Sequence, residues 1–219
     1  MSCLRFLVVS LMAGSVLPAE YFWGRCPSVP PMNDFDMEKF EGLWYVVEAF
    51  DNGERCMSLN ITKSTGSLDT WSIVEEKENG LFNALRLPHS TFNTGKISVP
   101  DKNNSAAMAV IWRLSGIAGH AAFTVHNTDY DQFASVFECQ NVGLFHRQTG
   151  LVLSRTPVLR VDLRQMARIQ TPDVKVEYYR RVSQSPCKYR RRQPEESRPA
   201  PPLHSQDDQW ATFNGMPNV

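Results

Sequence analysis

The stretch that decides the fold is Phe40-Glu41-Gly42-Leu43-Trp44-Tyr45-Val46-Val47-Glu48-Ala49-Phe50. Its glycine permits a tight backbone turn, and the tryptophan two residues later offers a large flat ring that can close one end of a core. The apolar run that follows is typical of a buried β-strand. We therefore expect the first strand to open here, over Gly42–Phe50.

Further strands are expected all the way from this stretch to Arg155, as short segments rich in β-branched and aromatic residues with turn residues between them. No helical pattern of roughly 10–15 residues interrupts them, which favours an antiparallel sheet with near-neighbour pairing over a βαβ arrangement. An up-and-down barrel or a sandwich fits this pattern. The later predicted strands are Cys56–Lys63, Asp69–Glu76, Leu81–His89, Gly95–Val99, Ser105–Leu114, His120–Asn127, Phe133–Cys139 and Leu144–Arg155.

A sandwich is the alternative to a barrel, because Cys56, Trp71 and Cys139 follow one another as in an immunoglobulin core. That fold places a tyrosine two residues before its second cysteine, where this chain has Phe137. The interval between the two cysteines is also long for such a domain. Both misfits favour the barrel.

Composition and motifs limit the classes of function. The 219 residues, 42% of them hydrophobic, suffice for one domain with a sizeable core. Lys plus Arg and Asp plus Glu both number 23, so no overall field draws the chain to nucleic acid. The sequence has no Gly-x-Ser-x-Gly elbow, His-Glu-x-x-His motif, Cys-x-x-Cys pair or phosphate loop. We therefore predict no catalytic residue, no cofactor, no metal site and no nucleic-acid partner.

The first 19 residues are typical of a secretory signal peptide. Arg5 precedes the apolar run Phe6–Met12, and small residues lead to a cleavage site after Ala19. The run is shorter than the roughly 18 apolar residues that a membrane anchor needs. We expect a secreted, extracellular protein.

Cleavage would remove Cys3 and leave four cysteines, an even number that suits an oxidising compartment. Spacing alone leaves three pairings open. Two sequons, at Asn60 and Asn103, predict glycosylation in the same compartment.

Short elements flank the strands. Asp34–Phe40 predicts a single helical turn before the first strand. After Arg155, an apolar stripe predicts a helix within Val158–Ile169 that packs outside the barrel, and Val174–Tyr178 alternates like a last short strand. Residues 188–219, rich in proline and charge, predict a disordered tail. The stripe consists of Leu159, Leu163, Met166 and Ile169.

Gly42-x-Trp44, Thr128-Asp129-Tyr130 and Arg155 recur in the order and at roughly the separations found in one family. The chain resembles the lipocalins, secreted β-barrels that carry small hydrophobic molecules. The resemblance implies an all-β fold, an eight-stranded up-and-down antiparallel barrel with one C-terminal helix outside. It also implies that Arg155 lies across the ring of Trp44, and that Thr128, Asp129 and Tyr130 form a turn near the same closed end.

Further matches place the chain near the apolipoprotein D-like lipocalins and extend the resemblance to about Cys26–Lys188. They are Cys26-Pro27, Asn33-Asp34-Phe35-Asp36, Gly53-Glu54-Arg55-Cys56, Cys139 and Pro186-Cys187-Lys188. The resemblance implies a barrel domain over residues 20–187 and the disulfides Cys26–Cys139 and Cys56–Cys187. The charged tail after Lys188 departs from the family pattern.

Strand alternation selects the residues that face the interior. In the strand Cys56–Lys63, a glycan on Asn60 would direct even-numbered side chains to water and odd-numbered side chains inward. In the first strand, the same alternation places Val46, Glu48 and Phe50 on the side of Trp44. We expect Glu48 to orient a ligand there. The candidate ligand-binding residues are Val46, Glu48, Met57, Leu59, Ile61, Trp71, Ile73, Met108, Val110, Trp112, Phe123 and Val125.

The expected function is the binding and transport of a small hydrophobic ligand, with a lipid, sterol, retinoid or pigment all compatible with an apolar interior. Delivery of that ligand leaves room for contact with a membrane or receptor. Two alternatives stay open. A lipocalin-type isomerase would need an unpaired Cys56, and a surface-interaction protein would have a filled core. The sequence does not indicate the oligomeric state.

Overall fold

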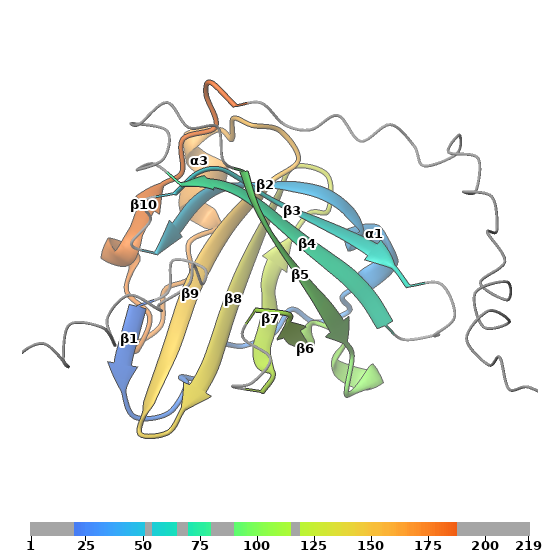
Figure 1. Cartoon of the computed structure of the whole chain (residues 1–219), viewed down its shortest axis with the longest axis vertical. Helices are drawn as coiled ribbons and strands as arrows, with labels where there is room; N and C mark the ends of the chain where they lie inside the picture. Colours follow the sequence, from blue (N-terminus) through green and yellow to red (C-terminus); the bar gives the residue numbers. More distant parts are fainter. Residues whose placement is uncertain (1–19, 51–53, 65–69, 80–89, 115–118, 188–219) are drawn as a thin grey trace, which may run out of the picture. The chain divides into compact units, whose positions relative to one another are not determined.

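The computed structural model describes residues 20–50, 54–64, 70–79, 90–114 and 119–187 (Figure 1). The predicted signal peptide, residues 1–19, and the predicted tail, residues 188–219, lie outside the described residues, as does the predicted strand Leu81–His89.

Within the described residues, eight antiparallel strands pair in sequence order from β2 to β9, and β9 pairs back to β2. This last pairing closes the sheet into an up-and-down barrel and rules out the sandwich. Two short strands extend it, β1 on β9 and β10 on β2. The strands are β1 (Glu20–Trp23), β2 (Gly42–Phe50), β3 (Glu54–Lys63), β4 (Thr70–Asn79), β5 (Ser90–Ser98), β6 (Ala107–Trp112), β7 (Ala121–Thr128), β8 (Phe133–Val142), β9 (Phe145–Ser154) and β10 (Tyr179–Arg181).

The helices of the described chain are α1 (Met37–Phe40), α3 (Val161–Met166) and the 3-10 turns η2 (Lys102–Asn104) and η4 (Val176–Tyr178). The predicted turn before the first strand is confirmed by α1, whose second and third amides, those of Glu38 and Lys39, donate to the Asp36 carboxylate. The strand predicted over Val174–Tyr178 is wrong, because η4 occupies its end and β10 starts only at Tyr179.

The outside helix is confirmed, but it is shorter than expected and its stripe is incomplete. Leu159 and Ile169 are buried, whereas Met166 is 63% exposed and Ala167 is buried instead. α3 spans only six residues, so the flanking stripe residues approach the barrel in non-helical backbone and no longer follow the helical period.

Apolar side chains gather in two clusters. The interior cluster surrounds Trp44 inside the barrel and draws on every strand from β2 to β9. The outer cluster lies between α3 and the outer faces of β2, β8 and β9, where Phe50, Phe137 and Val152 meet Leu159 and Ile169. The described chain therefore has two apolar cores, one inside the barrel and one between the barrel and the α3 segment.

Candidate functional site

Arg155 closes one end of the barrel, as the resemblance implied. Its guanidinium carbon lies 3.6 Å from the centre of the Trp44 ring. The same group donates from Nε to the Tyr130 carbonyl at 2.9 Å, from Nη1 to the Leu43 carbonyl at 3.1 Å and from Nη2 to the Lys39 carbonyl at 3.1 Å. Partial burial lowers the pKa of Arg155. We call Arg155 and Trp44 the floor clamp.

The glycine of the opening stretch makes room for this clamp. Gly42 has a φ of +99°, a conformation that side chains disfavour. A Cβ atom there would lie 3.3 Å from Nη1 of Arg155. Trp44 is fully buried and donates from Nε1 to the Phe40 carbonyl at 2.8 Å. The floor thus depends on α1 as well as on the strands.

The Thr128-Asp129-Tyr130 segment forms the expected turn into β8 at this end. The Asp129 carboxylate accepts hydrogen bonds from the amides of Asp131, Gln132 and Phe133. The Tyr130 hydroxyl accepts from the Asp36 amide at 2.9 Å. The turn therefore holds the entrance to α1 against the floor.

Eleven of the twelve predicted ligand-binding residues lie together in the interior cluster, as the alternation predicted. Their position makes them available to a ligand in the barrel, and their role in binding stays a prediction. Trp71 lies close to the floor and donates from its indole Nε1 to Glu41 at 2.7 Å. The eleven are Val46, Met57, Leu59, Ile61, Trp71, Ile73, Met108, Val110, Trp112, Phe123 and Val125.

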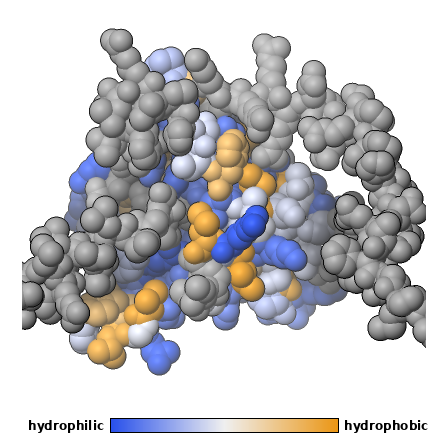
Figure 2. Space-filling view, viewed as in Figure 1, coloured by the Kyte–Doolittle hydropathy of each residue, from blue (hydrophilic) through white to orange (hydrophobic). Residues whose placement is uncertain are grey.

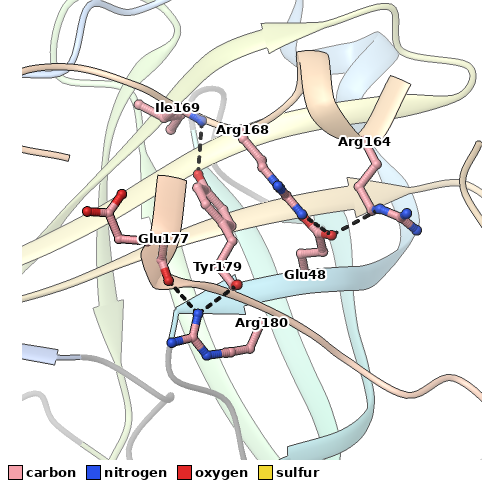
Figure 3. A network of polar contacts seen from close by, with 7 residues as sticks. All are labelled: Glu48, Arg164, Arg168, Ile169, Glu177, Tyr179 and Arg180. Carbon is pink, nitrogen blue, oxygen red and sulfur yellow. Dashed lines mark hydrogen bonds and ion pairs between the residues drawn. The ribbon is translucent and has the colours of Figure 1, made fainter. Parts of the chain in front are cut away.

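The prediction that Glu48 faces the interior is wrong. Its carboxylate accepts two hydrogen bonds from Arg168, at 2.7 and 2.8 Å, and lies 3.0 Å from Nε of Arg164 (Figure 3). Both arginines belong to the α3 segment outside the barrel. The bond to Glu48 raises the pKa of Arg168. Glu48 is fully buried, yet it anchors the helix and does not orient a ligand.

A β-bulge explains the error. The register between β2 and β9 shifts between Val46 and Glu48, so one extra residue breaks the alternation. Val46 and Ala49 face the interior cluster, while Val47 and Phe50 pack in the outer cluster. Phe50 therefore does not lie on the Trp44 side either.

Sequence reasoning missed a polar group on β4 inside the barrel. The side chains of Glu75 and Lys77 are 1% and 3% exposed, and Lys77 Nζ lies 3.8 Å from Glu75 and 3.6 Å from Glu54. Burial raises the pKa of Glu75 to about 7, with Lys77 opposing the shift. Alternation from Trp71 and Ile73 to Glu75 and Lys77 was the signal that could have found it.

A second interior polar group lies on β8 and β9. Trp112 donates from Nε1 to Glu138 at 3.0 Å, and Arg147 lies 3.8 Å from the same carboxylate. Burial raises the pKa of Glu138 to about 7, Arg147 and Trp112 oppose the shift, and the charge of Glu75 adds to it. The two groups are therefore close enough to influence each other.

Both disulfides implied by the resemblance are present in the described chain. Cys26 is bonded to Cys139, which ties the N-terminal segment to β8, and Cys56 is bonded to Cys187, which ties the C-terminal segment to β3. The isomerase alternative loses its nucleophile, because Cys56 has no free thiol.

The two sequons differ in exposure. Asn103 is exposed in η2, and Asn60 is partly exposed on β3, where its even-numbered neighbour Ser58 is buried. Their glycosylation stays a prediction.

In the described part of the chain, no three His, Cys, Asp or Glu side chains are grouped so that they could hold a metal ion. No helix among these residues has the length and apolarity to cross a membrane.

Comparison with known proteins agrees with the geometry. Apolipoprotein D of Cavia porcellus is 27% identical over 164 residues, which cover 71% of this chain and 81% of that protein. Lobster apocrustacyanin A1 superposes with a TM-score of 0.56 at 17% identity and covers 77% of this chain and 93% of its own. The chain has the lipocalin fold and is apolipoprotein D-like.

Insecticyanin from the tobacco hornworm Manduca sexta superposes similarly, with a TM-score of 0.54 at 17% identity over 75% of this chain and 89% of its own. At such identities the solved structures support the fold alone. No protein-family model matches the chain. The similarity in sequence to apolipoprotein D supports a lipocalin ligand-binding protein.

Proposed function

We propose that this protein is a secreted carrier that binds a small hydrophobic molecule inside its barrel. The observation that carries the proposal is the interior cluster, in which eleven residues selected from sequence lie inside the barrel together with Trp44. Burial of apolar ligand surface against such side chains supplies about 25 cal/mol for each Å². A lipid, sterol, retinoid or pigment would each gain in this way. The two disulfides support secretion, because such bonds persist in oxidising compartments.

The test is to fill the interior from β3. Leu59 and Ile61 are buried on its inner face, and replacing either with tryptophan should abolish uptake of a fluorescent fatty acid or retinoid while the barrel still folds. Ile111→Trp is the matched control, because Ile111 is 54% exposed on β6. This variant should take up the fluorescent ligand as the wild type does.

The results separate the carrier from a surface-interaction protein with a filled core. A filled interior would reject the added volume, and both inner variants would then unfold more easily by several kcal/mol. Uptake that persists in both variants would place the binding site elsewhere.

An exposed apolar patch supports membrane contact during delivery. Tyr21 and Trp23 of β1 are 65% and 72% exposed. Leu144, between β8 and β9, and Phe145, the first residue of β9, are 69% and 46% exposed. Figure 2 shows apolar surface at the lower left, where Figure 1 places these elements. β9 starts here and ends beside Tyr45 at the floor, so the patch lies at the opposite end of the barrel.

Flotation with neutral lipid vesicles tests this contact. The wild type should float with the vesicles, and Trp23→Ser should float less, because tryptophan is favoured at membrane interfaces. Equal flotation of both proteins would contradict a role for the patch, and failure of the wild type to float would favour a receptor.

A further inference from the structure

The barrel interior changes character along its axis. On β4, Ile73 pairs with Ile61 near the floor, and Glu75 and Lys77 continue the same face away from it. On β9, Leu153 lies near the floor and Arg147 near the opposite end. In the described chain, the interior is therefore apolar around Trp44 and polar at the far end.

The polar end holds buried hydrogen-bonding atoms of both kinds without partners among the described residues. The acceptors are both carboxylate oxygens of Glu75, Oδ1 of Asn93 and Oε2 of Glu138. The donors are Nζ of Lys77 and the hydroxyl of Thr149. Buried polar atoms without partners are rare in native proteins and costly. These atoms therefore suit a ligand that can both donate and accept hydrogen bonds.

These atoms lie on neighbouring strands that face one another across the barrel. Glu75 is the register partner of Asn93 on β5, and Glu138 is the register partner of Thr149 on β9. Alternation from Leu151 of the interior cluster puts Thr149 on the inner face. The charge of Glu75 helps to raise the pKa of Glu138, so the two pairs lie within electrostatic reach of each other. One polar head can therefore lie between them.

The charges give no reason for an ionised head of either sign. Lys77 lies 3.8 Å from Glu75, and Arg147 lies 3.8 Å from Glu138, so each of the two carboxylates already faces a cation. Glu54, which Lys77 approaches at 3.6 Å, and Arg147 have further interactions of their own. A head with a charge would bring one more desolvated ion into this space, whereas a neutral head would not.

The chemistry of the head follows from what each group can do. An ammonium only donates, so it would leave Lys77 without a partner, and a carboxylate only accepts, so it would leave Glu75 and Glu138 without one. A hydroxyl donates one hydrogen bond and accepts others. Hydroxyl groups therefore match both kinds of atom and add no charge.

We propose that the ligand is a neutral amphiphile with a hydroxylated head, such as a diol, which lies between Glu75 and Glu138 while its apolar part lies toward Trp44. This inference rests on the carrier function proposed above and names the class of its ligand. The hydroxyls donate to the carboxylates and accept from Lys77 and Thr149.

Four ligands with similar alkyl chains test the head group. Decane-1,2-diol, methyl decanoate, decanoic acid and decylamine would compete with a fluorescent retinoid for the full chain at about pH 8, where both buried carboxyls are largely ionised. The diol should displace the probe at a concentration about tenfold lower than the ester, because the ester has no proton to donate to a carboxylate. The ester is the more apolar molecule, so burial alone would give the reverse order. The two ionised ligands should also compete less well than the diol.

Variants localise the effect. Glu75→Gln and Glu138→Gln keep an acceptor but remove its charge, so each should weaken the diol about fivefold and leave the ester unchanged. Thr149→Val removes a hydroxyl with little change of shape and should weaken the diol by a smaller factor. Glu78→Gln, one residue after Lys77 and therefore on the opposite face of β4, is the matched control and should leave all four ligands unchanged.

The outcomes separate this inference from the carrier function. If the ester or either ionised ligand binds as tightly as the diol, or if both glutamine variants bind the diol as the wild type does, the hydroxylated head is overturned and the carrier function stands. If none of the four displaces the probe and none binds directly, the carrier function falls and the inference falls with it.

Discussion

Arg155 joins three separate segments of the chain through one guanidinium. Its three nitrogens donate to carbonyls of α1, of β2 and of the turn before β8, and its flat face covers Trp44. Lysine has neither the planar fork nor the number of donors for this arrangement. The motif is therefore architectural.

Replacing Arg155 with alanine should lower the free energy of unfolding by about 2 kcal/mol, because the cation–π contact and three hydrogen bonds are lost at a half-exposed site. Urea denaturation measures the change. Arg160→Ala is the control and should change stability by less than about 0.5 kcal/mol, since Arg160 is exposed and its ion pair is with nearby Asp162, which is exposed too. A denaturation curve for Arg155→Ala that overlays the wild type would contradict an energetic role for the clamp.

At the scale of elements, the bulge in β2 couples the barrel to its outer helix. It directs Glu48 outward into the α3 segment, where the carboxylate meets Arg164 and Arg168. Tyr179 of β10 adds to the same network by accepting a hydrogen bond from the Ile169 amide at 3.1 Å (Figure 3). Burial raises the pKa of Tyr179, so it stays protonated there. α3 is thus held by polar contacts as well as by the outer cluster.

Glu48→Gln should lower the free energy of unfolding by about 2 kcal/mol, because it leaves the two arginines side by side without a carboxylate. Both arginines are partly exposed, which keeps the loss below that for a fully buried pair. A double-mutant cycle with Arg168→Gln should give a coupling of about 1 kcal/mol or more. Additive effects of the two changes would show that the pair does not hold the helix. Ligand affinity should stay the same, since Glu48 lies outside the barrel.

For the whole molecule, two interior carboxyls should make stability depend on pH. The pKa of Glu75 and of Glu138 is about 7 in the folded protein, against 4.5 for an ordinary glutamate. Between these values the folded state holds protons that the unfolded state has released. Stability from these groups is therefore complete below about pH 4.5 and is lost as the pH rises through about 7.

Thermal unfolding followed between pH 5 and pH 8, a range of about three units, should show this loss as a fall on the order of 2–3 kcal/mol for each carboxyl. Glu75→Gln and Glu138→Gln should each remove part of the slope and raise stability at the upper end of the range. A flat profile in the wild type would mean that both carboxyls find adequate partners when ionised.

Local sequence determined the class of this protein. Alternation and turn residues predicted most of the strands, and Gly42-x-Trp44, the Thr128 turn and Arg155 indicated the lipocalin barrel and its closed end. Resemblance, and not spacing, led to the disulfide pairing. These features can be predicted from sequence because each depends on the alternation or motif of a few residues within one stretch of the chain.

Tertiary structure alone decided the direction of Glu48 and the assembly of the polar interior. A bulge is a mismatch between two strands, so β2 read by itself cannot show that Val47 and Glu48 both face outward. Glu75, Lys77, Glu138 and Arg147 come from three strands, and only closure of the barrel brings their charges into one buried space. The energies of buried charges depend on that shared environment, which no single strand contains.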